Sequence, residues 1–203
     1  MNKSKRIKDI IYQYYPQNYN WGTDYINSLE YRKQLQVRKN MQENVERKGK
    51  ITKLLAQIFK RFMVVDWSNI EEYNCYEFRI LIHQDQPIWD DDIQLIKKLN
   101  GVRYDLMLFI SILEKYYHFF FVETTFDERK KDTWSFRRFF ECPDHIVSLV
   151  DVMNTKLKKD GYCELSYKDV NEVVDDVETE LLNRGEVKVF SCLFTDLYPY
   201  EDL

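Results

Sequence analysis

Glycine is scarce in this sequence, and its scarcity excludes the loops that most often hold nucleotides. Five glycines occur among 203 residues, and none is close enough to another to form G-x-G-x-x-G or G-x-x-x-x-G-K-[ST]. Those loops need several glycines because the backbone must approach phosphate groups closely. A G-x-S-x-G turn is also missing, which disfavours the usual serine hydrolases. The glycines instead stand where we expect loops or helix ends, at Gly22, Gly49, Gly101, Gly161 and Gly185.

Cysteine and histidine are too few and too scattered to predict a common metal site. The four cysteines include no C-x-x-C pair, and the three histidines include no H-E-x-x-H or H-x-H pair. Zinc sites of the finger kind need close ligand pairs, because a short loop pre-forms half of the tetrahedron. We therefore expect free thiols and no metal or other cofactor. Cys142 and His145 are close enough in sequence for a thiol nucleophile, but burial of the thiol explains the cysteine at least as well.

Long apolar runs are absent as well. No window approaches the roughly 18 uninterrupted apolar residues that a membrane helix needs. The basic start, MNKSKRIKDIIYQYY, is not followed by the apolar core of a signal peptide. With 44% hydrophobic and 16% aromatic residues, the chain has the composition of a protein that folds around a core. We expect a cytoplasmic protein that does not contact membranes.

The sequence contains apolar patterns typical of both helices and strands. Apolar residues at helical spacing predict seven helices, over residues 7–14, 24–48, 51–62, 93–99, 106–116, 146–157 and 169–182. Alternation or aromatic enrichment predicts four strands, over residues 75–82, 118–126, 133–141 and 186–194. These elements predict an α+β fold, with a small antiparallel sheet of about four strands, about seven helices and a helical N-terminal third. We expect residues 1–203 to form a single domain, and leave open a basic helical subdomain over residues 1–66.

Three consecutive aspartates, Asp90 to Asp92, follow His83 closely and allow two interpretations. They could hold a metal ion together with His83, as in a carboxylate or metal enzyme. They are also placed to begin a helix, because Lys97 and Lys98 follow in its last turn and Gly101 stands after its end. Acid first and base last is the order that the helix dipole favours. A calcium loop would need ligands at alternate positions, so we favour the helix start.

Charge divides the chain unevenly. Residues 1–66 carry 14 basic and 6 acidic residues, a balance of +8, whereas the remaining residues carry 16 basic and 28 acidic residues, a balance of −12. The sum is the net charge of −4. Such asymmetry predicts either two parts that attract each other or two surfaces with different partners.

The acidic residues gather near the C-terminus, and four of them are our candidate partner-binding residues. They are Glu172, Asp175, Asp176 and Glu180, on the polar face of the helix predicted over residues 169–182. A solvated acidic face is the simpler interpretation. The functional one is a docking surface that attracts a basic protein through long-range charge. In profile the chain is similar to small acidic immunity-type proteins that inhibit basic bacterial toxins, which implies a non-enzymatic protein-binding module.

Basic residues and tyrosines alternate near the N-terminus and support a second hypothesis. The basic residues there include Lys3, Lys8 and Arg38, and the aromatic ones include Tyr14 and Tyr15. Positive charge with stacking aromatic rings is what a nucleic-acid surface needs. The tyrosines also have the spacing of core residues, and docking of the basic part on the acidic part explains the charges equally well. We rank nucleic acid below a basic protein as the partner.

Overall fold

The structure is a computed structural model, and it describes residues 3–83, 93–127 and 133–196. The described helices are α1 (Lys3–Ile11), α2 (Thr23–Ile26), α3 (Leu29–Glu43), α4 (Val45–Ile58), α5 (Ile93–Lys98), α6 (Val147–Lys159), α7 (Tyr167–Val170) and α8 (Val189–Leu193), with a short 3-10 helix, η2 (Asp144–Ile146). The described strands are β1 (Met63–Asp66), β2 (Cys75–Leu81), β3 (Val102–Ser111), β4 (Tyr116–Asp127), β5 (Thr133–Phe139) and β6 (Cys163–Glu164).

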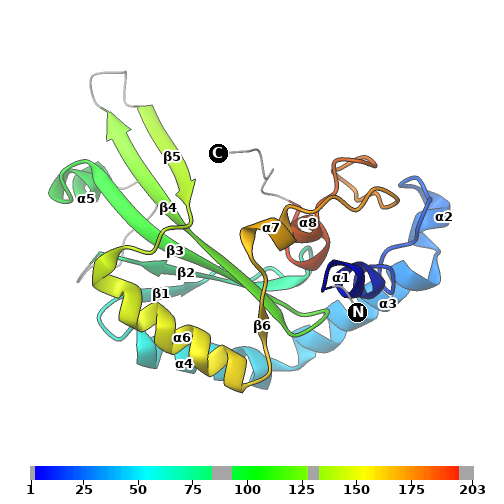
Figure 1. The fold of residues 1–203 in the computed structure, drawn as a ribbon, viewed down its shortest axis with the longest axis horizontal. Coiled ribbons are helices and arrows are strands. Elements are labelled where there is room, and N and C mark those ends of the chain that lie inside the picture. Colours follow the sequence, from blue (N-terminus) through cyan, green and yellow to red (C-terminus); the bar gives the residue numbers. More distant parts are fainter. Residues whose placement is uncertain (1–2, 84–92, 128–132, 197–203) are drawn as a thin grey trace.

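Five strands form one antiparallel sheet in the order β1-β2-β3-β4-β5 (Figure 1). The two-residue strand β6 pairs with the start of β4 in the parallel direction. Strands that follow one another in the chain are therefore neighbours in the sheet, as is usual for antiparallel sheets. The predicted α+β fold with an antiparallel sheet and a helical N-terminal part is confirmed. The described residues hold more strands than predicted, because β1, β3 and β6 were not expected.

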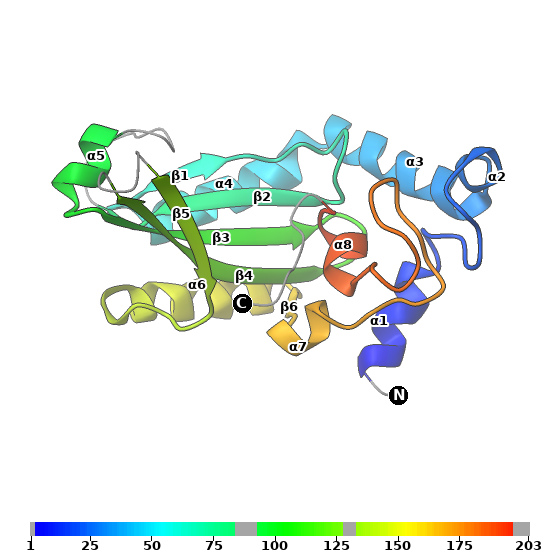
Figure 2. The ribbon, with the colours of Figure 1, turned by 90° about the horizontal axis from the view of Figure 1, so that it is seen from above.

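Helices cover the two faces of the sheet differently. Asp66 of β1 pairs with Lys48 of α4, with the Asp66 Oδ2 and Lys48 Nζ atoms 2.9 Å apart, which identifies the face that α4 covers. On this face α4 and α6 lie side by side (Figure 1). On the opposite face α8 lies across one end of the sheet (Figure 2), where the rings of Phe190 and Phe109 are 5.2 Å apart. The C-terminal segment thus packs on the face of the sheet that α4 and α6 do not cover.

One hydrophobic core joins the N-terminal helices to the rest of the molecule. Ile11 of α1, Leu55 of α4, Phe109 of β3, Met153 of α6 and Phe190 of α8 are all buried members of it. Residues 1–66 therefore contribute side chains to the same core as the sheet. A separate basic subdomain over residues 1–66 stays a prediction. No helix in the described part of the chain is both long and apolar enough to cross a membrane.

Two predicted elements have the wrong type. The helix predicted over residues 106–116 is wrong, because most of this stretch belongs to strand β3. Both faces of β3 are buried, so its apolar residues run on without alternation and fit a helical pattern equally well. The strand predicted over residues 186–194 is also wrong, since helix α8 occupies its second half. Every residue of α8 is buried, so no polar face marks its period.

The break predicted at Gly49 is wrong too. Gly49 lies inside α4, and the long helical stretch is interrupted at Asn44, whose side chain accepts a hydrogen bond from the Arg47 N–H and so caps α4. Other glycines end their helices as expected: Gly101 and Gly161 have φ angles of 83° and 85° after α5 and α6. These left-handed angles strain residues that carry a Cβ atom.

Candidate functional site: an acidic seam and an aromatic pocket

The acidic segment, residues 169–182, begins as predicted and then departs from the prediction. Ser166 and Asp169 form a capping box at the start of α7. The helix predicted to continue to residue 182 is wrong, because α7 ends at Val170. The Val174 N–H instead donates to the Val187 carbonyl, 2.8 Å away. β-Branched residues are poor helix formers, so a pairing with another segment can replace a valine-rich helix.

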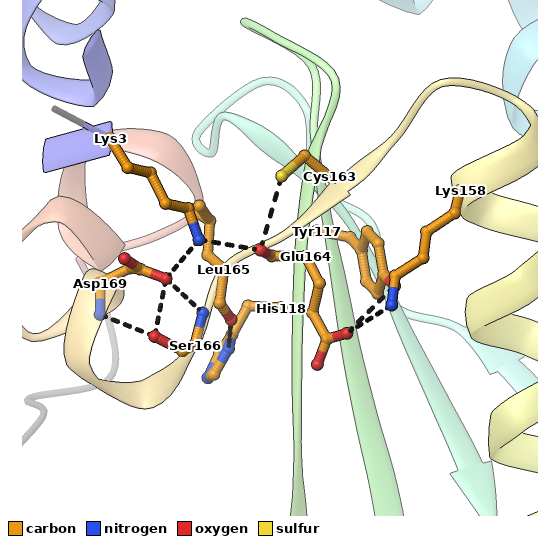
Figure 3. Close-up of polar contacts among 9 residues, drawn as sticks. All are labelled: Lys3, Tyr117, His118, Lys158, Cys163, Glu164, Leu165, Ser166 and Asp169. Atoms are coloured by element: carbon orange, nitrogen blue, oxygen red, sulfur yellow. Dashed lines mark hydrogen bonds and ion pairs between the residues drawn. The ribbon is translucent and has the colours of Figure 1, made fainter. Parts of the chain in front are cut away.

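The first part of the acidic segment lies against α1, where two ion pairs join them, and Figure 3 shows the one at the start of α1. We call the residues Asp169, Glu172, Asp176 and Glu178 the acidic seam. Lys3 Nζ is 2.7 Å from Asp169 Oδ2, on the side of α1 that faces α7 (Figure 3). Lys8, one turn further along α1, has its Nζ atom 3.1 Å from Glu172 Oε1. The basic N-terminal helix thus neutralises the beginning of the acidic segment.

Hydrogen bonds from uncharged donors to carboxylates continue the acidic seam beyond the ion pairs. The Tyr12 hydroxyl donates to Asp176 Oδ1 at 2.9 Å, and the Gln17 amide donates to Asp176 Oδ2 at 2.7 Å. The Trp21 N–H donates to Glu178 Oε2 at 2.7 Å. These contacts join residues that are more than 150 positions apart in the sequence. The seam therefore fixes the N-terminal end of the chain to its C-terminal segment.

The pKa values in the acidic seam follow from these contacts. A hydrogen bond from Ser4 lowers the pKa of Glu172 below its ordinary value. Lys8 lowers it further, and together these contacts outweigh burial, which acts to raise it. Burial acts to raise the pKa of Asp169, but hydrogen bonds from Lys3 and Ser166 outweigh it, and the pKa is lowered. Both carboxylates are charged at neutral pH, which is the form that the seam requires.

The end of the acidic segment, residues 179–181, lines a pocket of about 420 Å³. Residues of α3 also line it, and we call the buried lining residues from α8, from the chain just after it and from the loop that precedes β2 the floor of the pocket. Six aromatic side chains line this aromatic pocket: Tyr15, Trp21, Tyr25, Tyr31, Tyr73 and Phe194. Its volume falls within the range of about 300–1,000 Å³ that is usual for small-molecule sites.

A buried network around Asn74 holds the floor of the aromatic pocket. The Asn74 amide donates to the Tyr15 hydroxyl at 2.7 Å and to the Cys192 carbonyl at 3.0 Å. Its own oxygen accepts from Arg38 Nε of α3 at 2.9 Å. The Asn74 backbone N–H donates to the Phe194 carbonyl, also at 2.9 Å. One side chain thus connects the loop after α1 with α3 and α8.

Two buried polar groups in the aromatic pocket have no partner among the described residues. Gln34 of α3 is 2% exposed, and Ser191 of α8 is 8% exposed. Both side chains line the pocket, and neither forms a side-chain hydrogen bond to any described residue. The polar atoms of these two side chains are not fully enclosed by protein, so water or a ligand in the pocket can reach them. Such groups are therefore suited to a ligand that offers hydrogen bonds.

The rim of the aromatic pocket is acidic and partly apolar. Glu71, Glu72, Glu180 and Asp196 line it, against a single basic lining residue, Arg38. Burial raises the pKa of Tyr73 to about 12, and the hydrogen bond that Tyr73 donates to Glu72 adds to this shift.

Apolar side chains are exposed beside these carboxylates. Leu35 of α3 is 41% exposed, and Leu181 of the acidic segment is 59% exposed. Both line the aromatic pocket. Exposed apolar groups beside an acidic, concave surface are typical of an interaction site.

The structure separates the four predicted partner-binding residues into two pairs. Glu172 and Asp176 belong to the acidic seam and contact α1 and the loop after it. Asp175 and Glu180 are exposed, and neither forms a hydrogen bond or ion pair with another described residue. Only Glu180 lines the aromatic pocket. Of the predicted partner-binding residues the sequence therefore identified one pocket residue, and Tyr15 was singled out only for the nucleic-acid hypothesis. The amide residues and most of the aromatic ones were missed because the pocket residues come from four separate parts of the chain.

The N-terminal residues that suggested a nucleic-acid surface are mostly engaged elsewhere. Lys3 and Lys8 pair with the acidic seam, and Arg38 bonds to Asn74. Tyr14 and Tyr15 are buried in the core, where their rings cannot stack on bases. Nucleic-acid binding stays a prediction, with less of this surface left to support it.

Residues proposed for metal or thiol chemistry are not brought together in the described part of the chain. Asp90 to Asp92 lie outside the described residues, and His83 is buried after β2. Among the described residues, no three His, Cys, Asp or Glu side chains form a group that could hold a metal ion. Burial raises the pKa of the Cys142 thiol, with Asp151 and Asp144 adding to it, so the reactive thiolate is disfavoured there.

A charged cluster inside the sheet is a further feature that the sequence did not indicate. Asp105 of β3 is fully buried and accepts hydrogen bonds from Arg79 of β2 and Arg103 of β3. A buried carboxylate needs such partners because leaving water costs several kcal/mol. The cluster joins neighbouring strands and lies on the face opposite α4, according to the register and the strand alternation.

No protein-family model matches this chain, and no curated protein or solved structure matches it. We therefore argue its function from the geometry of the acidic seam and the aromatic pocket.

Proposed function

We propose that this protein is a non-enzymatic protein-binding module that takes a basic protein as its partner, in the manner of an immunity-type inhibitor of a basic toxin or effector. The observation that supports it is the aromatic pocket, in which four carboxylate residues and one arginine surround aromatic walls. Aromatic anchors and complementary charge are the features that give binding sites affinity and specificity. The proposal includes a cytoplasmic location, and the four free cysteines are compatible with it.

Contacts with the partner come from the exposed acids rather than from the acidic seam. Glu180 lies on the rim of the pocket, and Asp175 is exposed in the same segment. Glu172 and Asp176 contribute indirectly, because their bonds to α1 hold the segment in place. Leu35 and Leu181 supply apolar area beside the charge, which a protein partner can cover.

The test is capture from a lysate of the encoding organism, with wild-type protein and two charge-reversed variants. We expect a basic protein to be retained in near-equal amount at low salt and to be lost from the Asp175→Lys/Glu180→Lys variant. The matched control is Asp151→Lys, which reverses an exposed acid on α6, away from the pocket. Inhibition of the captured protein by stoichiometric addition would support the immunity-type role.

Two outcomes contradict the proposal. Equal capture by the Asp175→Lys/Glu180→Lys variant would remove this surface as the docking site. Retention of nucleic acid instead of protein, with affinity that falls steeply as salt rises, would favour the nucleic-acid hypothesis.

A further inference from the structure

We propose that the aromatic pocket recognises a guanidinium group, presented as an arginine side chain. That the arginine belongs to a protein partner rests on the proposed function. The chemistry of the recognised group rests on the walls, the buried polar groups and the charge of the pocket. Each of these three features favours a planar cation with several hydrogen-bond donors.

The first feature is a cluster of aromatic rings, in which Trp21 and Tyr31 are partly exposed and Tyr25 is fully buried. The ring centroids of Trp21 and Tyr25 are 4.7 Å apart, and Tyr31 packs edge-on to Trp21 at 5.6 Å. Aromatic faces attract cations, and the planar guanidinium group can also stack on them. Burial raises the pKa of Tyr25 well above its ordinary value. This ring therefore stays a neutral phenol at physiological pH, with its hydroxyl donating to the Glu178 carbonyl.

The buried polar groups supply the second feature. Gln34 and Ser191 line the pocket, and both are more than nine-tenths buried. Each offers an oxygen that can accept a hydrogen bond, and each lacks a side-chain partner among the described residues. A guanidinium group carries five N–H donors in a fixed planar arrangement. It therefore has enough donors for the oxygens of both residues and for a carboxylate at the rim.

Charge is the third feature. Glu71, Glu180 and Asp196 line the pocket, and none of these three carboxylates has a hydrogen bond or ion pair to a described residue. Arg38 also lines the pocket, but its guanidinium already donates to Asn74 Oδ1 and to the Glu71 carbonyl. Its charge reduces the attraction for a second cation without reversing it, because the carboxylates outnumber it.

The test uses small probes rather than the protein partner. N-acetyl-arginine methylamide carries the guanidinium group, N-acetyl-lysine methylamide carries a compact ammonium, and N-acetyl-norleucine methylamide is a neutral chain of similar shape. Binding to the full-length protein is followed by calorimetry and by NMR of the Gln34 side-chain amide. We expect the arginine probe to bind about tenfold more tightly than the neutral probe, as the attraction of a partly desolvated cation by aromatic rings predicts.

Variants locate the site. Glu180→Gln should weaken the arginine probe about threefold, in line with the loss of one partly exposed charge pair. Asp175→Asn removes the same charge from the same segment outside the pocket, and should leave the affinity unchanged. Gln34→Leu should abolish the preference for arginine over norleucine, whereas Gln36→Leu, on an exposed position of the same helix, should not.

Several results would overturn the inference. Equal affinity for the arginine and norleucine probes would show that the pocket does not recognise the guanidinium group. Tighter binding of the lysine probe would show that the pocket prefers an ammonium group. Equal weakening by Asp175→Asn and Glu180→Gln would show that the probe follows general surface charge.

The outcomes also separate this inference from the proposed function. Probe binding without capture of a basic protein would support guanidinium recognition by the pocket and contradict the proposed protein partner. Capture of a basic protein without probe binding would support the partner and contradict guanidinium recognition.

Discussion

The acidic segment meets the N-terminal third of the chain in two different ways. Its first part, up to Glu178, forms the acidic seam, where carboxylates contact Lys3 and Lys8 of α1 and the loop after α1. Its last residues line the aromatic pocket, where Glu180 has no partner among the described residues. Acidic residues a few positions apart in the same segment therefore differ in whether their carboxylates already contact other parts of the protein.

This difference shows why net charge is a poor guide to a binding surface. The +8 and −12 balances of the two parts suggested either internal attraction or external partners. In the structure the acidic seam accounts for internal attraction, and the rim of the pocket keeps one acid of the same segment, Glu180, that has no partner among the described residues. The two regions also differ in the strength of what holds them. The seam uses partly exposed ion pairs, whereas the pocket floor uses a buried hydrogen-bond network.

The largest effect should come from the floor of the pocket. Asn74→Ala removes two donors and one acceptor from a site that is 2% exposed, so that Tyr15 and Arg38 each lose one hydrogen bond. Tyr15 keeps its bond to the Cys192 carbonyl, and Arg38 keeps its bond to the Glu71 carbonyl. We expect the free energy of unfolding in urea to fall by about 2–3 kcal/mol. The control is Asn40→Ala, an exposed asparagine of α3, which should change it by less than about 0.5 kcal/mol. Equal losses in the two variants would contradict the role of the network.

A smaller loss should distinguish the paired acid from the unpaired one directly. Glu178→Ala leaves the Trp21 N–H without its acceptor and removes the ion pair with Arg184. We expect about 1–2 kcal/mol of lost stability in urea unfolding. Glu180→Ala, two residues later and exposed, should cost less than about 0.5 kcal/mol. If Glu180→Ala cost as much as Glu178→Ala, the division between seam and pocket rim would be wrong.

Acid should weaken the acidic seam and not the pocket floor. The pKa values of Asp169 and Glu172 are lowered in the folded protein. Their stabilisation is therefore fully present above the ordinary carboxyl pKa values, about 4, and is lost as pH falls through the lowered values. We expect the stability difference between wild type and Asp169→Asn/Glu172→Gln to shrink as the pH of urea unfolding is lowered from 7 to about 3. A difference that did not change with pH would contradict the lowered pKa values.

The smallest effect should come from the ion pairs of α1. Lys8→Ala removes the pair with Glu172, and we expect a loss of about 0.2–1 kcal/mol that decreases as salt is added. Lys5→Ala is the matched control, since Lys5 is exposed on α1 and has no ion pair with a described residue. Urea unfolding at low and high salt measures both variants. A loss for Lys8→Ala that salt did not reduce would indicate lost packing rather than lost charge.

Local patterns in the sequence predicted the elements that present one polar and one apolar face. Helices α1 and α6 show this contrast and were predicted with the correct type. Strands β2, β4 and β5 were also predicted with the correct type, although both faces of β2 are buried and its signal was the alternation of Glu77 and Arg79 with apolar residues. The Ser166 capping box was also visible, because its two side chains stand three residues apart. Patterns failed where both faces are buried, as in β3 and α8, since periodicity then carries no signal.

What the sequence by itself determined is the α+β class, the charge division and the exclusion of glycine-rich nucleotide loops. Only the tertiary structure decided which acids remain available. Val174 and Val177 have the spacing of a helix, yet they are buried by a chain that turns back to meet Val187. The pocket likewise depends on Gln34, Asn74 and Ser191, which are remote in sequence and meet only when α3 and α8 pack against the sheet. Contacts of this kind are set by packing over long sequence separations, which local spacing does not encode.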